Sequence, residues 1–238
     1  MGRKHVFIAT VFMLFVAATT SLALTADKYQ WKLEDTEDDC QIYTSPVAGK
    51  PYIAAKTTCM IPARMEVVAV VLSDIPNFPE WMHDCKETKV LKVVDEEKDL
   101  FIFWLRQHIP LLTDRDVVLK SSRTYNPETG SSTIISSSTN EMSYDSGEGY
   151  VRMPSLLNEL TLEWIPGDRE HTKVTFMTDP DLGKGLPKGI TNNQIKKLPL
   201  NTLKGMMKMV KLQKYIDSAK TSKYHQLIEE SIKAGDLK

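Results

Sequence analysis

The chain has 238 residues, of which 30 are Lys or Arg and 31 are Asp or Glu, so its net charge is −1. With 42% apolar residues it is long enough to bury one sizeable core. It contains no repeat, low-complexity tract or long linker, which argues against a repeat protein or several linked domains.

The N-terminus has the three parts of a secretory signal peptide. Basic residues precede an apolar run over residues 6–18, and small residues follow, with cleavage expected after Ala23 or Ala26. The run is shorter than the roughly 20 residues that span a bilayer. We therefore predict a signal peptide over residues 1–26 and one exported domain over residues 27–238. The domain would be periplasmic in a bacterium; secretion and an uncleaved membrane anchor are the alternatives.

The charge is unevenly distributed along the chain. Residues 27–181 carry an excess of acidic side chains, whereas residues 182–238 carry 12 Lys and Arg against 4 Asp and Glu. A basic C-terminal segment predicts transient contact with an anionic membrane surface. Export argues against nucleic acid as the partner. A solvated basic face without a partner is the alternative.

Three cysteines follow the predicted signal peptide: Cys40, Cys59 and Cys85. A turn centred on Gly49 and Lys50 would place Cys40 opposite Cys59 in a hairpin. Because opposed Cβ atoms on neighbouring strands lie about 4.5–5.5 Å apart, a disulfide between them is possible in an oxidising compartment. No cysteine spacing matches a zinc site, so we expect no metal and no cofactor.

The periodicity of apolar residues and the turn-forming residues between them predict the helices and strands in chain order. The hairpin is followed by a helix over residues 62–75, packed on one face. A meander of strands comes next, and then a long helix over residues 186–216 with a last helical stretch that Gly235 caps. The strands are expected at residues 86–95, 100–109, 115–125, 132–140, 149–154, 160–166 and 172–179. Antiparallel strands with helices at the ends indicate an α+β architecture.

Three segments resemble the START (steroidogenic acute regulatory-related lipid transfer) domain family. They are "FPEWMHDCKETKVLK", "LLTDRDVVLKSSRTY" and "TKVTFMTDPDLGKGLPKGITNNQIKKLPLNTLKGMMKMV", in the family's order. The resemblance implies a helix-grip fold, a curved antiparallel sheet around a long C-terminal helix, with an internal hydrophobic cavity for one lipid. It also implies a lid formed by that helix and the loop before Arg115. Where some sterol-binding members carry an acidic residue paired with an Arg, this chain has Leu105.

Period-2 alternation predicts which strand residues face the cavity. Arg115 is expected to bind a lipid polar group or to pair with an acidic residue, because a charge on an apolar face needs a partner. On the C-terminal helix, an apolar stripe would line the cavity and a lysine stripe would face the membrane. The lid loop would add an exposed apolar cluster. For the apolar positions, plain core is the alternative. The predicted ligand-binding residues are Phe101, Phe103, Leu105, Leu111, Leu112, Arg115, Val117, Leu162, Trp164, Phe176, Leu203, Met206, Met207 and Val210, and the membrane-facing residues are Lys204, Lys208 and Lys211.

The sequence therefore predicts a monomeric lipid-binding or lipid-transfer protein without catalytic residues. The histidines show no metal-ligand spacing, and no nucleophile or phosphate-binding motif is present. One alternative is a cyclase- or hydratase-like enzyme on the same fold, for which His108 would need a polar partner. The other is a ligand-sensing module without transfer activity.

Overall fold

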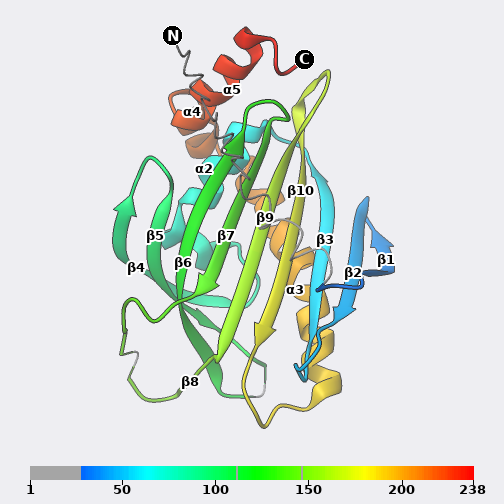
Figure 1. Cartoon of the computed structure of the whole chain (residues 1–238), viewed down its shortest axis with the longest axis vertical. Helices are drawn as coiled ribbons and strands as arrows, with labels where there is room; N and C mark the ends of the chain where they lie inside the picture. The colour runs from blue at the N-terminus through cyan, green and yellow to red at the C-terminus, as the bar shows by residue number, and fades with distance from the viewer. Residues whose placement is uncertain (1–27, 111, 146) are drawn as a thin grey trace, which may run out of the picture.

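The computed structural model describes residues 28–110, 112–145 and 147–238. The predicted signal peptide and Leu111 lie outside them. Strands of the described chain form one curved, mainly antiparallel sheet in the order β1-β2-β3-β10-β9-β7-β6-β5-β4, with β8 paired in parallel to β6 (Figure 1). The strands are β1 (Lys32–Glu37), β2 (Cys40–Pro46), β3 (Ile53–Ile61), β4 (Cys85–Asp95), β5 (Leu100–Gln107), β6 (Asp114–Asn126), β7 (Ser131–Ser138), β8 (Tyr150–Arg152), β9 (Ser155–Ile165) and β10 (Asp168–Asp181).

Helices pack on the concave face of this sheet (Figure 1). The long helix α3 contacts β3 and β10, and α2 lies between β9–β10 and the C-terminal helices. Their apolar faces and the inward residues of the strands share one buried core. This arrangement confirms the predicted α+β helix-grip fold. The helices are α2 (Met65–Ser73), the 3-10 helix η1 (Ile75–Glu80), α3 (Lys188–Met209), α4 (Gln213–Lys220) and α5 (Lys223–Ala234).

The C-terminal helical region is divided, whereas the sequence predicted one helix through Ile216. The chain turns after α3, and Leu212 adopts an extended conformation as the N-cap of α4. Ser222 caps the N-terminus of α5, because its Oγ accepts a hydrogen bond from the His225 amide at 3.2 Å. The helix α5 is followed by its C-cap, Gly235, with a φ of 85°, as predicted.

The β2–β3 hairpin has the register that the sequence predicts. Gln41 pairs with Thr58, so Cys40 lies opposite Cys59, and a disulfide joins the two. Cys85 is free and buried. The sequence did not predict β1, which pairs with the outer edge of β2.

An ionic cluster on the outer side of the sheet holds the first described residues. Asp179 on β10 is buried, and its carboxylate binds Lys28 Nζ and Lys50 Nζ, each at 2.6 Å, and the Tyr29 hydroxyl at 2.8 Å. Burial alone would raise the pKa of this carboxyl, but the hydrogen bonds from Lys28, Lys50 and Tyr29 lower it overall.

We expect Asp179→Asn to cost about 2 kcal/mol of unfolding free energy at neutral pH, because it removes charge-assisted hydrogen bonds. The folded-state pKa lies below the unfolded value of about 3.9. The Asp179 contribution is therefore complete above about pH 5 and is lost as the pH falls through the lowered pKa. Urea unfolding of both proteins across this range measures the difference. In Asp217→Asn, which alters an exposed carboxylate on α4, the loss should be small throughout. A difference for Asp179→Asn that stays constant into acid would contradict the prediction.

Candidate functional site

Three small cavities follow one another inside the molecule, between the concave face of the sheet and the helices. The inner cavity measures about 40 Å³ and is lined mainly by apolar side chains, including Phe101, Phe103 and Leu105 of β5. Its polar lining comes from Ser73, Asp99, Ser121, Arg123, Ser136 and Asn158.

The middle cavity and the lid cavity measure about 20 Å³ each. Met82, Leu105 and Asn158 border both the inner and the middle cavity. Gln107, Thr178 and Leu198 border both the middle and the lid cavity. Single side chains therefore separate the three spaces.

The lid cavity lies where the loop before Arg115 meets α3. His108, Ile109 and Pro110 line it from the loop, and Gln194, Ile195 and Leu198 line it from the first half of α3. Ile109 is buried rather than exposed, because it packs into this contact. Leu112 is partly buried against the core. The loop is thus closed onto the helix that it was predicted to accompany.

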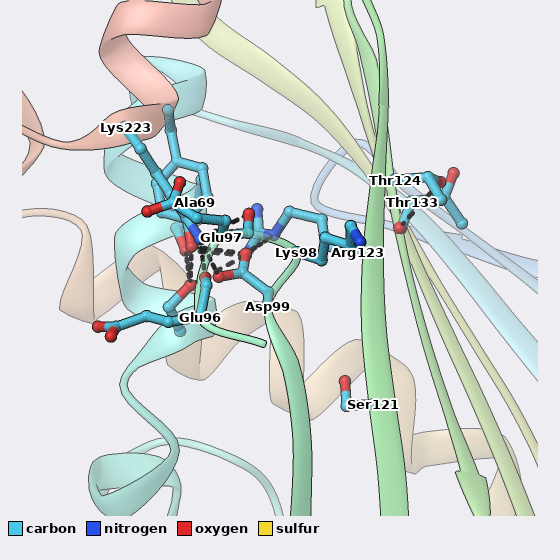
Figure 2. A network of polar contacts seen from close by, with 12 residues as sticks. Ala69, Glu96, Glu97, Lys98, Asp99, Ser121, Arg123, Thr124, Thr133 and Lys223 are labelled. Carbon is cyan, nitrogen blue, oxygen red and sulfur yellow. Dashed lines mark hydrogen bonds and ion pairs between the residues drawn. The ribbon is translucent and has the colours of Figure 1, made fainter. Parts of the chain in front are cut away.

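A charged network closes the opposite end of the inner cavity (Figure 2). Asp99, just before β5, binds Arg123 Nε of β6 at 2.6 Å and Lys223 Nζ of α5 at 2.7 Å. It also accepts a hydrogen bond from the Tyr224 hydroxyl at 2.7 Å. Burial is the main reason why the pKa of Tyr224 is raised to about 12, so the hydroxyl stays a donor at neutral pH. Arg123 Nη2 binds the Ala69 carbonyl of α2 at 3.1 Å.

Several predicted lining residues do lie on the cavity walls. Phe101, Phe103 and Leu105 line the inner cavity, and Phe176 lines the middle cavity. The β-strand alternation placed them there. That they contact a ligand stays a prediction.

Other predicted lining residues pack elsewhere. Val117 and Leu162 on the sheet, Leu203 and Met206 on α3 and Val210 at its C-cap are buried core, with Met207 partly buried beside them. They do not border the three cavities, because the inner cavity lies beside α2 and η1, and the other two lie beside the first half of α3.

Trp164 lies beyond the cavities, near the end of β9. Its indole Nε1 donates to the Lys238 carbonyl at 3.1 Å, and the Arg169 guanidinium lies 5.9 Å from the ring centre. β9 continues past the cavities, so correct alternation does not suffice to place a residue in them.

Arg115 is 4% exposed and does not border the cavities. Its Nε donates to the Leu182 carbonyl at 3.2 Å, and its Nη1 donates to the Thr113 carbonyl. The expected acidic partner is not found among the described residues; backbone carbonyls take its place. Arg115 therefore ties the loop before β6 to the chain after β10.

The three predicted membrane-facing lysines differ. Lys204 binds Glu37 at 2.6 Å and Asp38 at 2.8 Å in the β1–β2 turn, and these hydrogen bonds raise its pKa. Lys208 and Lys211 are exposed, and neither forms an ion pair with a described residue.

His108 has a polar partner. Its Nδ1 lies 2.8 Å from Asp114 Oδ1, and Asp114 Oδ2 binds Arg106 at 2.7 Å. Burial alone would raise the pKa of Asp114, but the bonds from His108 and Arg106 lower it overall, so the carboxylate is charged at neutral pH. This is the geometry in which a carboxylate orients a histidine, here beside the lid cavity.

Asp99 and Arg123 were not predicted from the sequence as site residues. The period-2 series Arg115, Val117, Leu119 continues through Ser121 to Arg123 on the same face of β6, so the signal for Arg123 was present.

The described part of the chain holds no cluster of three or more His, Cys, Asp or Glu side chains suited to a metal ion. Among the described helices, none is long and apolar enough to span a membrane.

The chain belongs to the START domain family, whose sequence profile matches residues 13–216. An uncharacterized protein of Pseudomonas aeruginosa is 30% identical over 197 residues, which are 81% of this chain and 93% of that protein. The helix α5 lies beyond the segment that the family profile matches.

Solved structures share the fold. A STAR-related lipid transfer protein from Xanthomonas axonopodis superposes with a TM-score of 0.67 at 23% identity, covering 76% of this chain and 99% of that one. Human STARD10 gives 0.67 at 17% identity, covering 88% and 85%. Human StAR-related lipid transfer protein 5 gives 0.65 at 15% identity, covering 79% and 91%.

Proposed function

We propose that this protein binds one hydrophobic ligand, a lipid or sterol-like molecule, between its sheet and helices and transfers it between membranes. The row of three cavities carries the proposal, because only single side chains interrupt a path from the charged network to the lid loop. Binding sites for small molecules usually measure about 300–1,000 Å³. The described conformation is therefore a closed one, and the ligand must displace side chains to enter.

The walls between the cavities suit such a displacement. Met82 separates the inner from the middle cavity, and its unbranched, polarizable side chain can repack around ligands of different shape. Apolar ligand surface that leaves water contributes about 0.8 kcal/mol per CH₂ group. An acyl chain thus gains enough to offset moving a few side chains.

Release would occur at a membrane after export. The exposed Lys208 and Lys211 follow the cavity-bordering part of α3, and each basic residue near an anionic surface adds on the order of 1 kcal/mol. Contact there would favour separation of α3 from the loop before Arg115, which together close the lid cavity.

A second candidate is chemistry on the bound ligand, favoured by the paired His108 and Asp114 beside the lid cavity. The carboxylate would hold the imidazole, and the imidazole would move a proton, as in a cyclase or hydratase.

Native mass spectrometry of the protein purified from the exported fraction of its own host tests both candidates. We expect a 1:1 adduct that denaturation releases as an intact lipid. Incubating the delipidated protein with that lipid and recovering a product of altered mass would favour the enzyme, and His108→Asn should then abolish the change. A protein that stays free of ligand after incubation with mixed lipids would contradict the binding function.

A further inference from the structure

The sheet carries a row of polar side chains across the floor of the cavities. Ser121 pairs with Ser136, Ser136 with Asn158, and Asn158 with Thr178 in the registers of four neighbouring strands, β6, β7, β9 and β10. All four border the cavities. We call this row the polar belt.

Apolar residues flank the belt on the side of the charged network. The next row of residues on the same face lies two positions further along each strand. It consists of Arg123 on β6, Ile134 on β7, Leu160 on β9 and Phe176 on β10. Figure 2 shows Ser121 and Arg123 on the same strand. A polar row within such a wall is costly unless its groups find hydrogen-bond partners.

Apart from Arg123 Nε, which is ion-paired with Asp99, two buried polar atoms on these walls have no hydrogen-bond partner among the described residues. Ser136 Oγ donates to Ser121 Oγ at 2.9 Å, but the acceptor Asn158 Oδ1 receives no hydrogen bond. At the end of the inner cavity, Arg123 Nη1 is a donor without an acceptor, in a side chain that is only 7% exposed. Each of these atoms would gain from a ligand group of the opposite kind.

Charge adds to this pattern. Asp99 is one carboxylate between two cations, Arg123 and Lys223, and its remaining partner Tyr224 is neutral. The network therefore carries one net positive charge, shared between Arg123, which borders the inner cavity, and Lys223, whose side chain is 28% exposed. An anionic group beside Arg123 would neutralise it and accept from Nη1.

The two unpartnered groups are separated. Arg123 and the belt differ by two residues along β6, about 7 Å, and Asn158 lies two strands further across the sheet, about 10 Å. One small headgroup cannot meet both. We infer that the ligand is an acidic amphiphile with a hydroxyl group partway along its chain. This rests on the proposed function, and it places the acid at Arg123 and the hydroxyl at Asn158.

Ricinoleic acid and oleic acid test the inference, because they share a chain and an acid and differ by one hydroxyl. Titration calorimetry of the delipidated protein should show ricinoleic acid binding about ten-fold more tightly than oleic acid, since the hydroxyl satisfies a buried acceptor. The methyl ester of each should bind about ten-fold more weakly than its acid.

Two variants assign the effect to the belt. Asn158→Leu should bring the affinities of the two acids within about two-fold of each other, because the acceptor is gone. Asn193→Leu, on an exposed position of α3, should keep the full difference. Equal binding of both acids and both esters by the unaltered protein would overturn the inference and leave the proposed function standing. Binding of none of the four would overturn the inference, and the proposed function would then be decided by the incubation with mixed lipids described above.

Discussion

We expect Asp99→Asn to lower the free energy of unfolding by about 3 kcal/mol or more. The substitution keeps the shape of the side chain but removes the charge that faces Arg123 and Lys223. The Arg123 side chain is only 7% exposed, so its charge cannot be solvated in place. Removing one partner of a buried ion pair typically costs about 3–5 kcal/mol. The cost is about 1–3 kcal/mol when the buried group that loses its hydrogen bond is neutral.

An exposed pair provides the control. Lys120 binds Glu141 at 2.6 Å, as short as the Arg123–Asp99 contact, but the two side chains are 36% and 53% exposed. Glu141→Gln should therefore cost less than about 1 kcal/mol. Urea denaturation of the three proteins at one pH measures both losses. Equal losses would show that burial does not decide the strength of the Asp99 network.

The second large effect is expected for Gly205→Ala in α3. A Cβ at this position would lie 2.1 Å from the carbonyl oxygen of Trp81, and a backbone atom cannot rotate away. The helix would have to move from the chain that connects η1 to β4. Inserting a methyl group into a close-packed contact typically costs about 1–3 kcal/mol, and we expect the upper end here.

Gly189→Ala is the matched substitution in the same helix. No atom lies within 4 Å of a Cβ at position 189. Alanine there should leave stability unchanged or raise it slightly, because alanine has the higher helix propensity. Thermal unfolding of the two variants distinguishes the steric effect of a Cβ at position 205 from the effect of helix propensity. Similar shifts in Tm would mean that α3 moves freely relative to Trp81.

Much of the fold could be predicted because most strands alternate and end at clear turn signals. β1 was missed because "KLEDTE" has no apolar alternation, and all six residues are exposed. Only backbone pairing with β2 makes it a strand. The break between α3 and α4 was missed because the apolar spacing continues through it. Its cause is tertiary: Val210 and Tyr215 both turn into the core.

The candidate site was less predictable for a related reason. The alternation of apolar residues reveals which side chains share a face of a strand, as for Phe101, Phe103 and Leu105. It does not reveal which part of that strand or helix lies beside a cavity. Leu203 and Met206 share the buried side of α3, yet the two cavities that touch this helix do so nearer its N-terminal end, at Ile195 and Leu198. The partners of Arg123 come from separate parts of the chain: Asp99 before β5, Ala69 on α2 and the Tyr224 ring on α5. Only the folded chain brings them together.

The separation of the interior into three small spaces has a kinetic consequence. A ligand bound as proposed would leave only after the walls formed by side chains such as Met82 and Leu198 had rotated and one end had opened. Loop opening of this kind takes microseconds to milliseconds or longer, so dissociation would be gated by the protein rather than by diffusion. Affinity would then be expressed mainly as a long residence time, with the ligand retained until a surface triggers its release.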